Sequence, residues 1–294
     1  MIITGKKFSK PEMSRVINGD VILDAAPEKP ELFRLDHLLV EQNHKYNRST
    51  LQSFIKSGFV TVNGEVVQKP NAKFPKDAKI ILNEPSTAKK LPKLEVIFED
   101  KNVIVLNKPA GLLSMAKGEY CPEPTLEDYG LLVHRLDRDT SGVVILSKNE
   151  ETRKMLREQF QDRKTHKTYY AVVCGRPKLD EAMIDLPIAR NLKHPTTFQV
   201  DPNGKSSQTY YKVLKSNDKF SFLELKPVTG RTHQLRVHLK YIGTPILGDK
   251  VYGDEKHKSA SRLFLHARSL EITIPKGDRK TFEAKTPKEF ESVL

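Results

Sequence analysis

The sequence predicts an α+β protein: a large domain built on a mixed, largely antiparallel sheet, and a small α/β domain before it. From residue 95 onward, short apolar runs alternate with Gly-, Pro-, Asn- and Asp-containing turns, a pattern typical of strands. Two stretches of that region, 151–163 and 232–241, instead carry apolar residues at helical spacing. This mix of many strands and few helices indicates the α+β class.

Changes in composition divide the chain into four parts. Residues 1–32 are polar with little periodicity, which indicates an extension without a core of its own. Residues 33–83 form a compact unit, and the Pro- and Lys-containing segment 84–94 is typical of a linker. Residues 95–294 are long enough to bury a substantial core and make up the large domain.

The small domain is predicted to contain two helices and a few short strands. The first helix opens at Phe33, and the second is capped by Asn47 or Ser49 and ends at Gly58. The pair Asn63-Gly64 predicts a tight hairpin turn between apolar residues. The strands are expected at 59–62, 65–67 and 79–82.

Two basic residues stand out on the second predicted helix, Arg48 and Lys56. Basic side chains on a helix and the loop that follows it suit contacts with nucleic-acid phosphates. A solvated helix face would have the same composition, so the pattern alone leaves both interpretations open.

The charge of the whole chain points in the same direction. Lys and Arg total 50 against 37 acidic residues, a net charge of +13. An excess of this size favours a polyanionic partner such as nucleic acid, although a lysine-rich surface without such a partner fits equally well.

Other features of the composition exclude several classes of protein. The longest apolar runs fall far short of the roughly 18 residues that a membrane helix needs, and the N-terminus has no apolar centre typical of a secretory signal. Cys121 and Cys174 lie far apart, so neither a disulfide framework nor a zinc site is indicated. We therefore expect no membrane partner, no metal and a reducing, cytoplasmic location.

The large domain is predicted as a series of strands. The helix at 151–163 and the helix at 232–241, which ends at Gly243, lie among them. The strands are expected at 96–98, 103–106, 131–133, 143–146, 168–173, 197–200, 207–214, 220–226, 263–265 and 269–274.

The most informative segment is the polar turn 134–142 between two of these strands. Its sequence places the carboxylate of Asp137 between the guanidinium groups of Arg135 and Arg138. A carboxylate among fixed positive charges favours its ionised form and can act as a nucleophile or base at neutral pH. Turn geometry alone also explains Asp, Thr, Ser and Gly here, so this segment does not by itself decide between catalysis and structure.

Several motifs in the large domain resemble those of the Rlu-type (RluA family) RNA pseudouridine synthases. They occur in family-like order over roughly 95–275, and such a series is specific. The unit 33–83 in turn resembles the small RNA-binding domain shared with ribosomal small-subunit protein four. The matching segments are 107–111, 134–142, 167–169, 230–238, 242–249, 252–253 and 262–267 in the large domain and 59–64 in the small one.

The resemblance implies roles for three residues. Asp137 corresponds to the essential catalytic carboxylate, and Arg236 to the arginine that pairs with it. Helical spacing puts Arg236 beside Leu235 and Leu239 at the edge of the core, where an arginine requires a carboxylate. Tyr169 corresponds to the active-site tyrosine, which can stack on the base or assist proton removal. Strand alternation alone would allow Tyr170 instead.

For the remaining polar residues of the motifs, we expect supporting roles. Arg135, Arg138 and Arg231 are expected to contact RNA, as are Arg48 and Lys56 in the small domain. The histidines of the motifs, His134, His233 and His266, are expected to be structural hydrogen-bonding groups.

The resemblance further implies an enzyme that needs no cofactor and no metal. It would isomerise uridines in structured RNA, with ribosomal large-subunit RNA favoured as substrate and transfer RNA as the alternative. An inert RNA-binding or ribosome-assembly protein of the same fold is the competing hypothesis. We expect the protein to act as a monomer.

Overall fold

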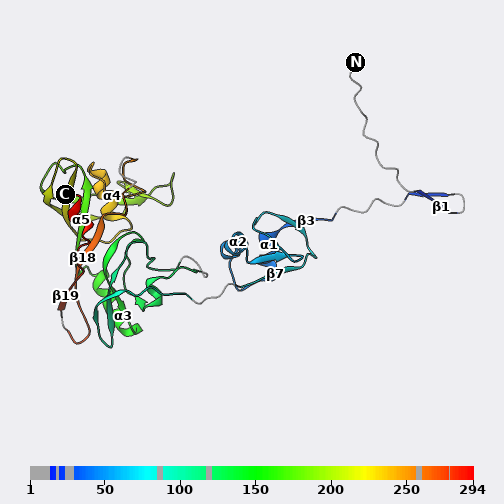
Figure 1. The fold of residues 1–294 in the computed structure, drawn as a ribbon, viewed down its shortest axis with the longest axis horizontal. Coiled ribbons are helices and arrows are strands. Elements are labelled where there is room, and N and C mark those ends of the chain that lie inside the picture. The colour runs from blue at the N-terminus through cyan, green and yellow to red at the C-terminus, as the bar shows by residue number, and fades with distance from the viewer. Residues whose placement is uncertain are drawn as a thin grey trace, which may run out of the picture. The chain divides into compact units, whose positions relative to one another are not determined.

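The computed structural model describes residues 14–17, 20–23, 30–84, 89–116, 121–255, 260–277 and 279–294. The chain forms two compact units, Met1–Ser86 and Thr87–Leu294 (Figure 1). Much of the expected extension, 1–32, and residues 85–88 of the expected linker, 84–94, lie outside the described residues.

The first unit combines two short helices with small antiparallel sheets. The helix predicted to open at Phe33 begins two residues later, because Phe33 and Arg34 belong to a strand that pairs with Phe74 and Lys73. The elements are β1 (Ser14–Ile17), β2 (Asp20–Leu23), β3 (Leu32–Arg34), α1 (Leu35–Gln42), α2 (Arg48–Lys56), β4 (Val60–Val62), β5 (Glu65–Val66), β6 (Lys73–Pro75) and β7 (Ile80–Leu82).

The predicted cap and turn of this unit are both present. The side chain of Asn47 accepts a hydrogen bond from the backbone N–H of Thr50 at the start of α2. Asn63 and Gly64, between β4 and β5, both have positive φ, 53° and 88°, as the tight hairpin turn requires.

A buried carboxylate holds the two helices together. Asp36 of α1 accepts hydrogen bonds from Arg34 Nε at 2.9 Å, Arg48 Nη2 at 2.8 Å and Gln52 Nε2 at 2.6 Å. Burial acts to raise the pKa of Asp36, but these three side chains outweigh it and lower the pKa. The guanidinium of Arg48 is thus engaged within this unit.

The second unit is built on a ten-stranded mixed sheet with the order β13-β16-β17-β12-β18-β11-β9-β8, in which β10 also pairs with β11 and β19 with β18. All of its pairings are antiparallel except β11 with β18. The strands are β8 (Glu95–Glu99), β9 (Val103–Lys108), β10 (Leu131–Leu132), β11 (Ser141–Ser147), β12 (His166–Cys174), β13 (Glu181–Asp185), β16 (Gln208–Ser216), β17 (Phe220–Pro227), β18 (Leu265–Thr273) and β19 (Arg279–Glu283). The predicted fold class is confirmed.

Helices and a small hairpin complete this unit. The two predicted helices are present, although the second begins two residues later than expected. The elements are η1 (Leu126–Asp128), α3 (Glu150–Gln161), α4 (Gln234–Tyr241), α5 (Glu289–Ser292) and the hairpin strands β14 (Ile188–Arg190) and β15 (Phe198–Val200).

Several boundaries differ from those predicted. The two strands expected at 263–265 and 269–274 form one strand, β18, whose pairing with β12 is interrupted by a register shift. β13, β19 and α5 were not predicted. The apolar residues of β13 are consecutive and β19 is mainly polar, so neither shows the apolar alternation of a half-buried strand.

Helices cover different parts of the sheet. Val143 and Ile145 of β11 pack with Leu156 of α3, whereas Val144 and Leu146 point to the opposite face and pack with Leu126. α4 and α5 lie together over β12 and β17, at the other end of the unit from α3 (Figure 1). The segment before β11 is therefore fixed between two separate parts of the core.

Gly142 permits the close approach of β11 to β18. Its φ is +115°, and a Cβ placed on it would lie 2.1 Å from the carbonyl oxygen of Ala267. We expect Gly142→Ala to lower the free energy of unfolding by about 3 kcal/mol or more, because backbone strain and a steric clash add. In Gly175→Ala, where φ is +78° but nothing lies within 4 Å, strain alone should cost about 1 kcal/mol. Equal losses in urea denaturation would contradict the packing explanation.

Two histidines with pKa values lowered by burial make this unit sensitive to acid. His134 Nε2 accepts from the backbone N–H of Ile145 and its ring stacks on Phe160, while His266 Nδ1 lies 2.8 Å from Ser141 Oγ. Burial lowers the pKa of His134 to about 3 and that of His266 to about 4. The unfolded chain therefore binds more protons than the native one below pH ~6.5, so stability falls as the pH falls.

Between pH 7 and pH 5, each of these histidines should remove roughly 2 kcal/mol from the free energy of unfolding. Chemical denaturation at the two pH values measures this loss. His134→Gln, which keeps an acceptor but does not titrate, should show a smaller difference between the two. An unchanged difference would rule out a contribution from His134.

Candidate active site

The turn that carries Asp137 is fixed by its backbone. The predicted strands on either side pair as a hairpin, with Leu132 opposite Leu146. The ammonium of Lys108, which is fully buried, donates to the carbonyl oxygens of Pro109, Arg138 and Thr140 at 2.8–3.0 Å. Burial lowers the pKa of Lys108 to about 7, while three carbonyl acceptors match the three N–H groups of the charged form. Lys108 thereby holds both sides of the turn.

Arg236 links the turn to a second carboxylate. Its Nη1 lies 3.2 Å from Asp137 Oδ2, and its Nε and Nη2 lie 2.7 and 2.8 Å from the two oxygens of Asp249. The expected contact between Arg236 and Asp137 is therefore present. Since Arg236 is 7% exposed and Asp249 1% exposed, the bidentate pair is fixed inside the protein and leaves one N–H face for Asp137.

The electrostatics of this pair follow from its surroundings. Burial acts to lower the pKa of Arg236, but the bonds to Asp249 and Asp137 raise it overall. Burial acts to raise the pKa of Asp249, which Arg236 and the backbone N–H groups of Val251 and Tyr252 lower. Both groups are charged at neutral pH.

His233 lies closer to the carboxylate than expected. It is the residue before α4, with φ at 54°, and its Nε2 is 3.8 Å from Asp137 Oδ2. The hydroxyl of Tyr252 accepts from the N–H of Phe198 and lies 2.8 Å from His233 Nδ1. In the tautomer in which this hydroxyl donates to Nδ1, the ring proton is on Nε2 and faces Asp137. Burial lowers the pKa of His233. We therefore add His233 to the site.

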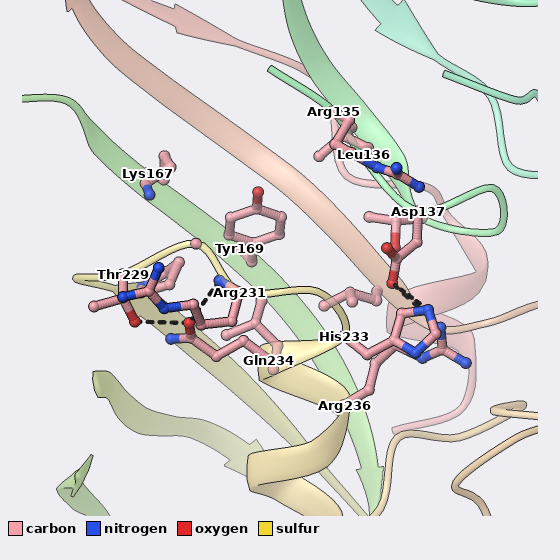
Figure 2. A pocket seen from close by; sticks show the side chains of 15 residues that line it. Arg135, Leu136, Asp137, Lys167, Tyr169, Thr229, Arg231, His233, Gln234 and Arg236 are labelled. Atoms are coloured by element: carbon pink, nitrogen blue, oxygen red, sulfur yellow. Dashed lines mark hydrogen bonds and ion pairs between the residues drawn. The ribbon is translucent and has the colours of Figure 1, made fainter. Parts of the chain in front are cut away.

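Asp137 faces a cavity of about 110 Å³ (Figure 2). Tyr169 and Lys167 of β12 line it, as does the turn 229–231 before α4. Strand alternation did not decide between Tyr169 and Tyr170. In the structure Tyr170 points away from the cavity and contacts Phe222. The ring of Tyr169 and the carboxylate of Asp137 thus face the same small cavity.

The chemistry of Tyr169 is limited by its surroundings. Burial and the charge of Asp137 raise the pKa of Tyr169 above its usual value. The phenol is therefore protonated at neutral pH and can stack on a ring or donate a hydrogen bond. Its action as a base would require the hydroxyl proton to leave in the same step.

Gln234 fixes the turn that forms the opposite wall. Its Oε1 accepts from the hydroxyl of Thr229 at 2.7 Å and from the N–H of Arg231 at 3.0 Å, while its Nε2 donates to Gln208 O. The guanidinium of Arg231 donates to the carbonyl oxygen of Ser206 at 3.2 Å. Arg231 therefore lines the cavity with its backbone already positioned.

One prediction about this site is wrong. Arg135 and Arg138 do not hold Asp137 between them, because Arg138 pairs with Glu123 at 2.9 Å and Arg135 Nη1 lies against Met115 Sδ. Adjacent residues of the turn point in different directions, and the cations that contact Asp137 come from the segment around α4 instead. Arg135 still lines the cavity, and Arg138 lines a neighbouring one.

Sequence reasoning gave no role to Lys108, Asp249, Gln234 and Lys167, although all four lie within the motifs quoted for the resemblance. Arg48 and Lys56 belong to the first unit, where Lys56 is exposed at the end of α2. In the part of the chain that the structure describes, no group of three or more His, Cys, Asp or Glu side chains could hold a metal ion. None of the described helices is both long and apolar enough to cross a membrane.

Comparison with known proteins identifies the family. Residues 102–241 match the family described as RNA pseudouridylate synthase, and residues 33–79 match the S4 domain. An uncharacterized RNA pseudouridine synthase of Aquifex aeolicus is 36% identical over 292 residues, which cover 88% of this chain and 92% of that protein. The chain belongs to the RNA pseudouridine synthase family.

Two further proteins show how far the similarity of this synthase extends. Ribosomal large subunit pseudouridine synthase D of Borreliella burgdorferi is 36% identical and matches 89% of each chain. The solved structure of human RNA Pseudouridylate Synthase Domain Containing 1 is 28% identical, with a TM-score of 0.58 over 70% of this chain and 86% of that one. The expected family, RNA-binding domain and enzyme class are thus confirmed.

Proposed function

We propose that this pseudouridine synthase isomerises uridines in ribosomal large-subunit RNA and that Asp137 is its catalytic carboxylate. The observation that carries the proposal is the contact of Asp137 Oδ2 with buried Arg236, at 3.2 Å, in a cavity that Tyr169 also lines. The names of relatives from Borreliella burgdorferi and Vibrio cholerae, large-subunit synthases D and C, support the choice of substrate.

The reaction moves the ribose from N1 of uracil to C5. Asp137 acts at the sugar, either by attacking C1′ or by removing the 2′ proton, and Arg236 holds the carboxylate in position for either step. Tyr169 stacks on the uracil, and the walls of the cavity keep the detached base next to the sugar while it rotates. The target must leave its stack to enter, which costs a few kcal/mol and is easiest in a loop.

RNA affinity would come from basic side chains outside the reacting centre. Arg135 and Arg231 line the cavity, and Arg138 lies beside it, so we assign to them the phosphates near the extruded nucleotide. Lys56, with the half-exposed guanidinium of Arg48, would contact RNA from the first unit. The net charge of +13 supports salt-sensitive binding.

Location and assembly follow from the proposed substrate. An enzyme that acts on ribosomal RNA works where ribosomes are made, and we infer a cytoplasmic location. We also infer that the protein acts as a monomer. Size-exclusion chromatography with light scattering tests this inference.

The deciding experiment incubates the purified protein separately with large-subunit RNA transcript and with transfer RNA. Pseudouridines are then mapped by chemical modification and primer extension. We expect one or a few stops in the large-subunit RNA. If stops appear only in transfer RNA, transfer RNA is the substrate. If no stops appear in either RNA, or in total RNA from cells lacking the gene, the protein is an inert RNA-binding protein.

A further inference from the structure

Lys167 is a cation of the catalytic cavity to which the mechanism above gives no role. It lies on β12 two residues before Tyr169, so the two side chains share one face of the strand. Its Nζ lies 3.9 Å from the position that a Cβ on Gly230 would occupy. In Figure 2, Lys167 and Asp137 lie on either side of the Tyr169 ring.

The ammonium of Lys167 has no protein partner among the described residues. Arg236 and Arg231, which also line this cavity, bind two carboxylates and the carbonyl oxygen of Ser206 respectively, whereas exposed Arg135 lies against Met115 Sδ. Burial lowers the pKa of Lys167, and no facing carboxylate offsets that effect. A partly buried ammonium without an acceptor is unfavourable, so a bound ligand is expected to supply one.

The shape of the cavity indicates which part of the RNA that acceptor belongs to. A cavity of about 150 Å³ can hold a benzene ring, and the space beside Lys167 is about 110 Å³, on the scale of one planar ring. The RNA strand continues on both sides of a phosphodiester, so a phosphodiester site must be open at both ends. It fits better in the adjoining cavity of about 340 Å³, which Lys167 also borders and where the exposed cations Arg163 and Lys226 lie closer to solvent.

We propose that Lys167 donates a hydrogen bond to a carbonyl oxygen of the target uracil and stabilises the negative charge that the base acquires when its bond to ribose breaks. This inference rests on the proposed function, because it assumes that a uridine enters this cavity. It adds to that function a group that acts on the base, whereas Asp137 acts on the sugar.

The electron balance is the same for both routes of Asp137. When C1′–N1 breaks, its electron pair goes to N1 and spreads over O2 and O4, so that uracil leaves as an anion. On the sugar, C1′ gains either a bond to the Asp137 carboxylate or a double bond to C2′ as the 2′ proton moves to Asp137. C5 then bonds to C1′ as the ester to Asp137 breaks or, on the other route, as C2′ takes the proton back from Asp137, and the C5 proton is finally lost to solvent. A cation facing O2 or O4 therefore lowers the barrier for cleavage in either case.

The test compares single-turnover rates at saturating RNA for wild type, Lys167→Met and Lys167→Arg. We expect Lys167→Met to lower the rate about 10²- to 10³-fold, as for the loss of one charge-stabilising donor. The dissociation constant for RNA should stay within about threefold of the wild-type value, because a single contact to an uncharged base contributes little to overall affinity. Lys167→Arg should recover part of the rate. Lys212→Met, an exposed lysine of β16 that pairs with Glu181, is the matched control.

A second substrate separates charge stabilisation from a merely structural role. Fluorine at C5 withdraws electrons, so the detached base is a less basic and more stable anion. Its negative charge therefore needs less stabilisation from the protein. Because 5-fluorouridine has no C5 proton to lose, cleavage of the C1′–N1 bond is the step compared between the two substrates, and the cleavage defect of Lys167→Met should shrink about tenfold with 5-fluorouridine at the target. Both defects are measured with the same variant protein. A smaller fraction of folded enzyme would lower both rates by the same factor, so it would not change the ratio of the two defects.

Three outcomes would overturn the inference: a wild-type rate in Lys167→Met, equal defects with uridine and 5-fluorouridine, or weaker RNA binding with a shallower salt dependence and an unchanged saturating rate. The last outcome would assign Lys167 to a phosphate instead. If the wild-type enzyme isomerises no uridine at all, the proposed function fails. If it does so and Lys167→Met does so equally well, only this inference fails.

Discussion

Replacing Asp137 with asparagine is expected to lower the single-turnover rate of uridine isomerisation by at least about 10⁴-fold, the scale of losing an essential nucleophile or base. Asparagine has nearly the same shape and can still accept from Arg236 Nη1. It cannot form an ester with C1′, and it cannot hold the 2′ proton. Both routes therefore fail, while RNA affinity should stay within about threefold.

A neighbouring carboxylate provides the control for this variant. Asp139 lies two residues further along the same turn and is exposed, so Asp139→Asn removes the same charge from the same surface without touching the contact with Arg236. Its rate should stay within about threefold of wild type. If Asp137→Asn retains more than about one hundredth of the wild-type rate, or if Asp139→Asn fails equally, Asp137 is not the catalytic group.

The second large effect is expected at Asp249. Alanine there leaves the buried guanidinium of Arg236 with Asp137 as its remaining carboxylate and also removes the acceptor for the N–H groups of Val251 and Tyr252. Breaking a buried pair from one side costs about 3–5 kcal/mol of the free energy of unfolding. We expect Asp249→Ala to lose about that much in urea denaturation. Its activity should also fall, because Arg236 is then free to move toward Asp137.

The nearby carboxylate Asp254 is the matched comparison for Asp249. It pairs with Lys240 at 3.5 Å, and both side chains are about half exposed. Asp254→Ala should therefore change stability by less than about 1 kcal/mol. Asp249→Asn, which keeps the shape and an acceptor, should lie between the two. Similar losses in Asp249→Ala and Asp254→Ala would show that the buried pair has no structural importance.

Local patterns in the sequence were sufficient for most of the fold. The cap at Asn47, the turn at Asn63-Gly64 and the hairpin around Asp137 depend on residues within a few positions of each other, and each is present. Strand β13, in contrast, is a short edge strand without apolar alternation, and its pairing with β16 makes it a strand. Its sequence carries no signal of that partner.

The site was predicted to a smaller extent, for a related reason. Helical spacing placed Arg236 at the edge of the core, and the structure has it there, 7% exposed. No local pattern could indicate that Asp249 would accept from Nε and Nη2 of Arg236, because that contact depends on how the segment after α4 returns to the helix. The direction of the Arg138 side chain was predicted wrongly for the same reason, since its partner Glu123 belongs to a separate segment.

The position of β18 has a consequence for when the enzyme can become active during its synthesis. This strand lies at the centre of the sheet between β11 and β12, yet it follows both of them in the sequence. A nascent chain that ends before residue 265 lacks the strand that joins β11 to β12, so the sheet that carries the turn of Asp137 stays incomplete. Such distant pairing also slows folding. Catalysis must therefore wait until β18 has been synthesised, and a chain that ends before residue 265 should be inert.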